Sequence, residues 1–292
     1  MNVKNAERSA TARTVLIATL VLNWAIAAAK VVFGMLANLS SMVADGFHSF
    51  SDGASNILGL IGINIASRPA DREHPYGHKK FETFFSLGIA ALLFLLCVNF
   101  VSEGIRRFLH PVPTSVTGAS FAVMIVTLAV NLSVMWYENR VGRRLKSDIL
   151  VSDAKHTMGD IFTSLSVIAV MIADKFGMPG LDPAATIIIA VFIANAAVSI
   201  VKDSAQVLCD GTPALDTAGI EAVVRSVKGV SACHKIRARG REDDIYVDLH
   251  VQVDPAMRVD DAHDVSYRIE AAIKEKIPGV ADVVVHIEPK SR

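Results

Sequence analysis

Two segments of the chain carry the same pattern, Asp-x-x-His-x-x-x-Asp, inside otherwise apolar sequence. The first copy comprises Asp45, His48 and Asp52, and the second comprises Asp153, His156 and Asp160. Spacings of three and four residues place such side chains on one face of a helix. Imidazole nitrogens and carboxylate oxygens are ligands of Zn²⁺ and of other divalent metals. The pattern therefore predicts one metal site shared by two helices, with ligands His48, Asp52, His156 and Asp160.

Each copy alone has a plainer interpretation. A single histidine on a helix is more often packed or hydrogen-bonded than bound to metal, and a single aspartate could pair with Lys30. Ionisable groups at membrane depth are costly, so two matched copies favour a functional site. Asp45 and Asp153 are weaker ligand candidates, because they could instead orient the imidazoles or line an entry path.

The composition indicates a membrane protein. The chain has 292 residues, of which 52% are hydrophobic, and a mean hydropathy of +0.42. Six apolar segments are long enough to cross a bilayer, at 14–36, 42–66, 83–107, 116–138, 153–174 and 183–202. Basic residues gather before the first segment and after the second and fourth, which predicts that both termini are cytoplasmic.

The remaining composition excludes other classes. The net charge is zero and no basic aromatic surface is evident, so we expect no nucleic-acid partner. No nucleophile elbow, phosphate-binding glycine loop or HExxH motif is present, so we do not expect an enzyme. The three cysteines are too scattered for a disulfide framework.

The C-terminal part, residues 208–292, changes character and predicts a soluble domain behind a membrane domain of residues 1–207. Its patterns predict the order helix, strand, strand, helix, strand, which is that of a small ferredoxin-like α+β domain. It holds four histidines and a nearby carboxylate: His234, His250, His263, His286 and Glu288. Lone histidines on strands are usually structural, but this group favours a second metal site.

The loop after the second apolar segment places Asp71, His74 and His78 within eight residues. One interpretation is a solvated, charged loop that anchors the membrane span. The other is a third metal site, and the spacing alone favours the charged loop.

Taken together, these motifs resemble the cation diffusion facilitator family of six-span divalent-metal transporters, over nearly the whole chain. The pairs His48–Asp52 and His156–Asp160 match the family's transport-site pairs in its second and fifth helices. The resemblance implies Zn²⁺ as cargo, with Fe²⁺, Mn²⁺, Cd²⁺ and Co²⁺ less favoured. It also implies exchange against protons, which histidine chemistry near neutral pH supports.

The resemblance implies further sites. Asp71, His74 and His78 match a second metal site of the family, and the C-terminal histidines resemble its cytoplasmic binuclear site between two subunits of a homodimer. Glu288 stands where many relatives have Asp. A Lys80–Asp210 pair matches an interlock between the membrane and soluble domains.

Alternatives remain. An iron or manganese exporter of the same family is one, and a membrane-anchored metal sensor or scaffold is another. The compact chain favours a bacterial cytoplasmic (inner) membrane as its location.

Overall fold

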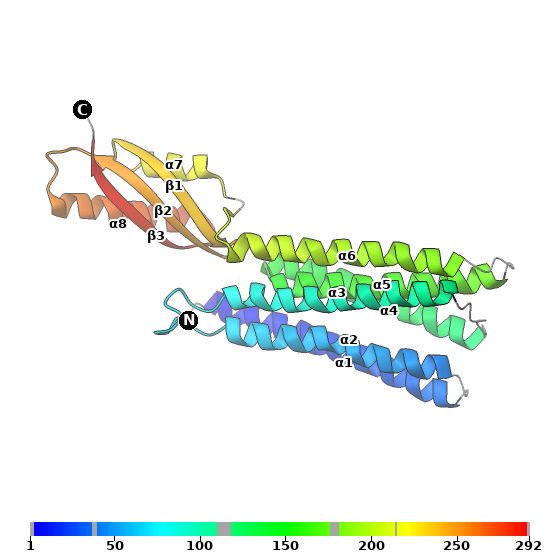
Figure 1. Cartoon of the computed structure of the whole chain (residues 1–292). Coiled ribbons are helices and arrows are strands. Elements are labelled where there is room, and N and C mark those ends of the chain that lie inside the picture. Colours follow the sequence, from blue (N-terminus) through cyan, green and yellow to red (C-terminus); the bar gives the residue numbers. More distant parts are fainter. Residues whose placement is uncertain (1–2, 37–39, 110–117, 176–180, 214, 291–292) are drawn as a thin grey trace. The chain divides into compact units, whose positions relative to one another are not determined.

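A computed structural model of the chain describes residues 3–36, 40–109, 118–175, 181–213 and 215–290. These residues divide into two compact units, residues 1–204 and 205–292. Long helices form the first unit, and a small sheet with two helices forms most of the second (Figure 1).

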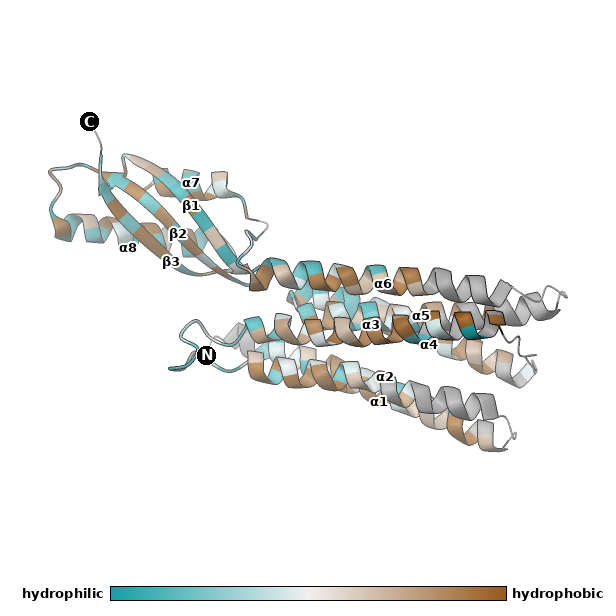
Figure 2. Cartoon of the chain, in the orientation of Figure 1, coloured by the Kyte–Doolittle hydropathy of each residue, from teal (hydrophilic) through white to brown (hydrophobic). Residues whose placement is uncertain are grey.

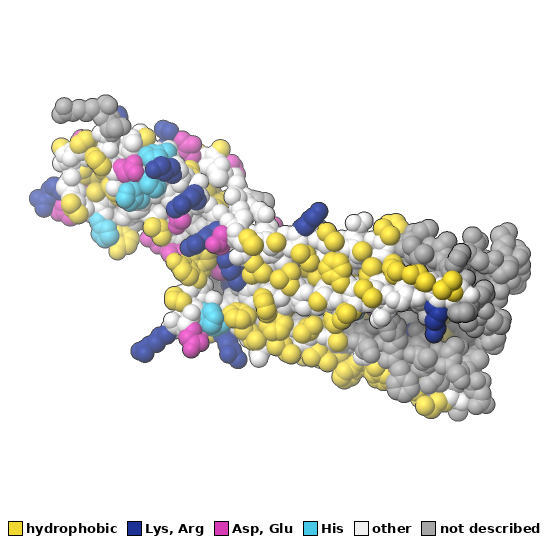
Figure 3. All heavy atoms as spheres, in the orientation of Figure 1, with side chains coloured by type: hydrophobic (Ala, Val, Ile, Leu, Met, Phe, Trp, Pro, Cys, Tyr) yellow, Lys and Arg dark blue, Asp and Glu magenta, His cyan; other side chains and the backbone are white. Residues whose placement is uncertain are grey.

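The long helices run side by side (Figure 1). In chain order they are α1 (Val3–Leu36), α2 (Ser40–Ala66), α3 (Lys80–Leu109), α4 (Gly118–Leu145), α5 (Asp148–Lys175) and α6 (Leu181–Leu208). Large apolar side chains such as Val21, Leu95 and Val98 are about 60% exposed on the outside of this bundle. Figure 2 shows that hydrophobic residues predominate along the helices, and Figure 3 shows apolar side chains on the bundle surface in that view, where lipid is expected.

Within the described residues, four segments are long and apolar enough to cross a membrane: Glu7–Val32, Lys80–Asn99, Phe121–Leu145 and Ala190–Leu208. They lie in α1, α3, α4 and α6. The chain is therefore an integral membrane protein, whereas the expectation of six spans stays a prediction. The fourth apolar segment was predicted to end at residue 138, but the helix continues to Leu145.

A glycine allows α2 to pack closely against α3 and α5. A Cβ atom at Gly62 would lie 2.6 Å from Ile149 Cδ1 and 2.7 Å from Phe85 Cβ. Side chains larger than hydrogen do not fit there, and small residues serve this purpose at many membrane helix contacts. The packing matters for function because α2 and α5 carry the two copies of the acidic-histidine pattern.

The second unit contains α7 (Thr217–Arg225), β1 (Ala232–Arg241), β2 (Asp244–Val253), α8 (Val259–Lys276) and β3 (Val280–Pro289). This is the predicted order of helices and strands. β1 pairs antiparallel with β2, and β2 pairs parallel with β3. Residues alternate along β2 between buried and half-buried, so one sheet face packs on α7 and α8 and the other carries polar side chains.

Candidate metal sites

His156 and Asp160 both lie on α5, as predicted. The His156 side chain is only 6% exposed. Asp160 lines a cavity of about 20 Å³ together with Asn23, Ile26, Ser49, Thr127 and Asn131, from α1, α2 and α4. Most of these neighbours offer polar atoms, so the Asp160 carboxylate faces a small polar space inside the bundle.

The other half of the predicted transport site comes from α2. The helix includes positions 45, 48 and 52, but the side chains of Asp45, His48 and Asp52 lie outside the described residues. A contact close to them is described: Asn56 Nδ2 on α2 donates a hydrogen bond to Asp153 Oδ2 on α5. This contact joins Asn56, four residues after position 52 of α2, to Asp153, the first residue of the pattern on α5.

The loop between α2 and α3 brings Asp71, His74 and His78 together, with one ligand atom of each within 4.8 Å of the others. His74 Nδ1 lies 3.5 Å from Asp71 Oδ1, and His78 Nε2 lies 3.4 Å from Asp71 Oδ2. The two imidazole rings are 4.5 Å apart between centroids. We call these three residues the loop cluster.

Backbone groups hold the loop cluster in place. The N–H groups of His74 and Glu73 donate to Asp71 Oδ1 at 2.7 and 3.0 Å, and this lowers the pKa of the Asp71 carboxyl group. His78 Nδ1 lies 3.0 Å from the carbonyl oxygen of Pro69 and must donate to it. His78 Nε2, which faces Asp71, is then the ring nitrogen that accepts a proton or a metal.

One nitrogen of the loop cluster makes no hydrogen bond to a described residue, although it lies 3.5 Å from Asp71 Oδ1. His74 Nδ1 is buried and has no hydrogen-bond partner within the described part of the chain. Buried polar atoms are usually hydrogen-bonded, so an exception calls for an explanation such as an unseen ion. A cation bound between His74, His78 and Asp71 fits this donor set, which has two nitrogens and one carboxylate.

The second cluster crosses the exposed face of the sheet. In the strand register, His234 on β1 is paired with His250 on β2, and His250 is paired with His286 on β3. His250 Nδ1 lies 2.6 Å from Glu288 Oε1, and His234 Nε2 lies 3.2 Å from Glu288 Oε2. The carboxylate thus bridges two imidazoles, and the hydrogen bond from His250 lowers the pKa of Glu288.

His234, His250 and Glu288 are able to offer one ligand atom each to a common ion, and we call them the sheet cluster. His286 Nε2 lies 3.8 Å from Glu288 Oε1, and its ring is 4.6 Å from that of His250. Figure 3 shows the histidines gathered on this unit.

The remaining predicted ligand of the second unit lies elsewhere. His263 is exposed on α8, where its ring packs 4.6 Å from that of Tyr267. Within one chain it is not a member of the three-residue group.

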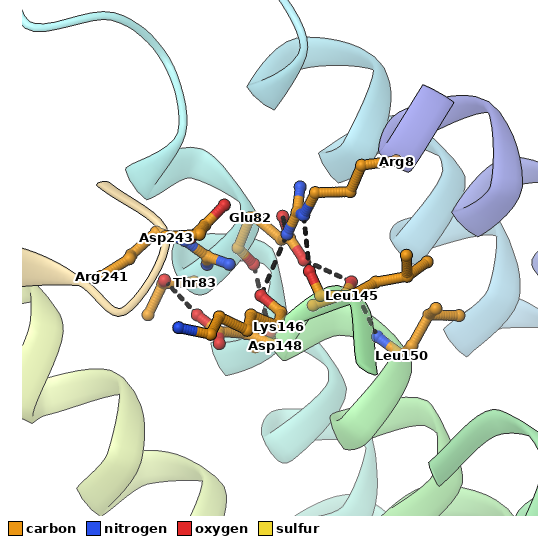
Figure 4. Close-up of polar contacts among 11 residues, drawn as sticks. Arg8, Glu82, Thr83, Leu145, Lys146, Asp148, Leu150, Arg241 and Asp243 are labelled. Carbon is orange, nitrogen blue, oxygen red and sulfur yellow. Dashed lines mark hydrogen bonds and ion pairs between the residues drawn. The ribbon is translucent and has the colours of Figure 1, made fainter. Parts of the chain in front are cut away.

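A buried ion pair, which the sequence analysis did not identify, joins the helices at one end of the bundle (Figure 4). Arg8 on α1 donates to Glu82 Oε2 on α3 at 2.8 Å and to the carbonyl oxygen of Leu145 at 2.7 Å. Ser147 donates to the other oxygen of Glu82, whose side chain is 1% exposed. The network therefore fixes the start of α3, which directly follows the loop cluster.

Lys80 begins α3, and Asp210 follows α6 in a left-handed conformation, with φ of 56°. Asp210 Oδ2 lies 3.8 Å from Arg239 Nη1 within the second unit. The pairing of Lys80 with Asp210 stays a prediction.

Comparison with known protein families gives two matches. Residues 16–209 match the family model of the cation efflux transmembrane domain, and residues 212–290 match that of the cytoplasmic domain of cation efflux proteins. Together these models span most of the chain.

Individual relatives cover nearly the full length. An uncharacterized transporter of Methanocaldococcus jannaschii is 31% identical over 94% of this chain and 96% of its own. The manganese efflux system protein MneS of Bacillus subtilis is 27% identical over 90% of this chain and 91% of its own. A cadmium, cobalt and zinc/H(+)-K(+) antiporter of the same organism is 26% identical over 90% of this chain and 84% of its own.

Among solved structures, "MamM-CTD 215-293" is 31% identical, covers 24% of this chain and 90% of its own, and has a TM-score of 0.24.

Proposed function

The chain belongs to the cation efflux family of membrane metal transporters, and we propose that it exports Zn²⁺ from the cytoplasm in exchange for protons. The relatives are named for manganese or for cadmium, cobalt and zinc, so divalent metal export is common to them. Zinc is preferred here because the pattern residues supply two imidazoles and two carboxylates, a tetrahedral nitrogen and oxygen set. Manganese prefers more oxygen ligands, and iron is the closer alternative.

The packing of α2 against α5 supports a transport site between them. Gly62 on α2 lies against Ile149 on α5. Asn56, six residues before Gly62, contacts Asp153, which is four residues after Ile149. The chain direction of the two helices is therefore opposite along this contact.

Continuing the same packing by one helical turn brings position 52 of α2 level with positions 156 and 160 of α5. We therefore place the cargo between His48, Asp52, His156 and Asp160, with Asp45 near its entrance. This arrangement is the single most important support for the proposal.

Proton exchange follows from the ligands. Imidazole binds Zn²⁺ only when it is neutral, so loading the site displaces protons and acidification displaces the metal. A pH gradient can then drive the cargo, provided that the site opens alternately to the two sides. The name of the antiporter relative supports the same coupling.

We also propose six spans with both termini in the cytoplasm of a bacterium, and a homodimer. The sheet cluster with His286 would bind regulatory Zn²⁺, and a second copy of the chain would add His263 from its exposed position on α8. Metal at a subunit interface stabilises the dimer arrangement that supplies the ligands. The loop cluster is a further metal site on the same side of the membrane.

A metal sensor or scaffold is the second candidate function. The sheet cluster, which lies outside the membrane helices, favours it, because a sensor needs only that site. Polar and ionisable residues inside the bundle argue against a sensor or scaffold. Such residues are costly in a membrane, and a helix bundle that only anchors the protein does not require them.

Zinc flux into proteoliposomes under an imposed pH gradient tests the proposal. We expect gradient-dependent flux in the native protein and a loss of more than about a hundredfold in Asp52→Ala, because a ligand is removed. Asp203→Ala is the matched control, since Asp203 is an exposed aspartate that pairs with Lys155 at 3.1 Å. Parallel assays with Mn²⁺, Fe²⁺, Cd²⁺ and Co²⁺ rank the cargo.

Absence of flux for every metal, with zinc binding at the sheet cluster intact, would move the assignment to the sensor. The regulatory role has its own test. If His250→Ala combined with Glu288→Ala left the metal dependence of transport unchanged, the sheet cluster would not regulate transport.

A further inference from the structure

Two carboxyl groups that are not part of the proposed four-ligand transport site meet inside the helix bundle. Glu138 on α4 is 0% exposed and Asp153 on α5 is 1% exposed. Their side chains are within hydrogen-bonding reach of each other. Burying one acidic group is costly, and burying two side by side is costlier unless charge is removed or neutralised.

The neighbours of this pair are neutral hydrogen-bonding groups. Thr157 Oγ1 lies 3.4 Å from Glu138 Oε2, and Thr19 on α1 is a further hydrogen-bonding neighbour of Glu138. Asn56 donates to Asp153, and Ser55 on α2 is a further hydrogen-bonding neighbour of Asp153. The helices packed against α4 are α1 and α5, and Asp153 is the one charged or titratable group that contacts Glu138 within the described residues.

Each carboxyl group keeps one oxygen without a partner. Glu138 Oε1 and Asp153 Oδ1 are buried and accept no hydrogen bond from any described residue. Two facing carboxylates offer only acceptors, whereas one proton between them turns one oxygen into a donor. A single bound proton therefore lets one carboxyl group donate a hydrogen bond to the other, and it removes one of the two charges.

Glu82, the other buried glutamate among the described residues of the bundle, has different surroundings. Glu82 accepts from Arg8 at 2.8 Å and from Ser147, so the charge of a guanidinium group stands beside this carboxylate. Glu138 has a second acid in place of the arginine. The contrast indicates that the Glu138 pair is built to hold a proton, not to tie helices together by an ion pair.

We propose that Glu138 and Asp153 share one proton and that this pair is a proton-binding site of the transport cycle, separate from the metal ligands. The proposal rests on the proposed exchange of metal against protons. Asp153 precedes His156 by three residues, which is about 4.5 Å along the helix axis. A divalent cation held by His156 and Asp160 therefore acts on the pair at short range in a poorly screened interior.

The coupling follows from charge. When the cation is bound, its field favours the ionised pair: the O–H bond breaks, the proton leaves to water, and the charge of the pair changes from −1 to −2. When the cation leaves, the pair takes a proton back from water. The pair thus adds one exchanged proton to those displaced from the imidazoles.

Infrared spectroscopy tests the shared proton without any metal. The native full-length protein should show the C=O stretching band of a protonated carboxylic acid near neutral pH. Glu138→Gln and Asp153→Asn should each remove this band, while Glu82→Gln should leave it. A band that persists in both variants, or is missing from the native protein, would overturn the proposal.

Proton release on metal loading tests the role in transport. In weakly buffered solution, we expect Glu138→Gln to bind Zn²⁺ and to release about one proton fewer per metal than the native protein. Equal proton release would refute the role in coupling. Failure of native protein to transport any metal, with the infrared band present, would refute the proposed function and leave the shared proton standing.

Discussion

The loop cluster and the sheet cluster hold the same kinds of ligands, yet they are built in opposite ways. In the loop, Asp71, His74 and His78 come from eight consecutive residues, and backbone groups of the same loop orient them. In the sheet, Glu288 meets His250 from 38 residues away, and the strand register aligns them. The loop cluster therefore depends on local turns, whereas the sheet cluster depends on the fold of a whole unit.

The difference predicts how each cluster responds to change. A site supported by strands keeps its geometry without metal, because β1, β2 and β3 are fixed by the core beneath them. A loop site gains more of its order from the ion itself. Distant core substitutions should therefore damage the sheet cluster, and local ones should damage the loop cluster.

The largest effect is expected from Leu249→Ala. Leu249 precedes His250 on β2, faces the core and is 1% exposed. Truncating it should destabilise the second unit by about 2–5 kcal/mol and weaken the sheet cluster with it, while the loop cluster binds metal as before. Hydrogen exchange of the β2 amides in the full-length protein measures the change.

Val284→Ala is the matched control, since Val284 is 59% exposed on β3 and should cost less than about 0.5 kcal/mol. Equal losses in the two variants would mean that the core does not support the cluster as described.

The sequence was informative wherever function depends on short spacing. The intervals of three and four residues predicted one helix for His156 and Asp160, which the structure has, and they singled out Asp71, His74 and His78, whose side chains the structure brings together. Alternation of apolar residues also predicted the strands and their order. The full set of ligands for each site stays a prediction.

Spacing says less about contacts made across the fold. The sequence grouped four histidines with Glu288, but only the register of the three strands shows which of them approach it, and it leaves His263 apart. Glu138 was missed because it stood at the predicted end of the fourth span, where an acid is expected to face water. The position of Glu138 at the end of an apolar segment does not predict that its side chain is buried against Asp153.

The second prediction removes the bridging ligand of the sheet cluster. Glu288→Ala should weaken zinc binding there by about a hundredfold, because both imidazoles lose the carboxylate that orients them. Calorimetric titration of the full-length protein measures it. Glu221→Ala, an exposed glutamate of the same unit that pairs with Arg225, should bind as tightly as the native protein.

Glu288→Asp sharpens this result. A shorter arm keeps the charge and shifts the oxygen, so its affinity should fall between those of native protein and Glu288→Ala. Full affinity in Glu288→Ala would show that the imidazoles bind metal without this carboxylate.

The third prediction concerns the loop cluster, and its expected effect on zinc affinity is smaller. Asp71→Ala should reduce zinc affinity of this site by about tenfold or more and also loosen its turn, because Asp71 both faces the imidazoles and accepts from two backbone N–H groups. Asp71→Asn keeps an acceptor for the turn and loses the charge. Glu73→Ala is the control from the same loop.

If Asp71→Asn loses as much zinc affinity as Asp71→Ala, the charge of Asp71 causes the effect. If Asp71→Asn retains its zinc affinity, the turn causes it. Unchanged affinity in Asp71→Ala would show that the loop cluster does not bind zinc through this residue.

The smallest expected effect is a change in carboxyl pKa. It distinguishes the two clusters because a different group lowers the pKa in each. For Asp71 the largest cause is the backbone N–H of His74, and for Glu288 it is the hydrogen bond from the His250 side chain. We therefore expect His250→Ala to return the pKa of Glu288 toward its ordinary value of 4.5. His78→Ala should leave most of the lowering at Asp71, because the backbone donors remain.

The sign of the pH effect follows from these directions. A carboxyl pKa that is lower in the folded state means that the unfolded chain takes up protons first as the pH falls. The stabilisation is complete above the ordinary values of 3.8 for Asp71 and 4.5 for Glu288, and it is lost as the pH falls through the lowered folded values. NMR titration of labelled carboxyl groups in metal-free protein measures both. The contradicting outcome is an equal rise of the two pKa values, that of Asp71 in His78→Ala and that of Glu288 in His250→Ala. It would mean that side chains, and not backbone groups, lower the carboxyl pKa in both clusters.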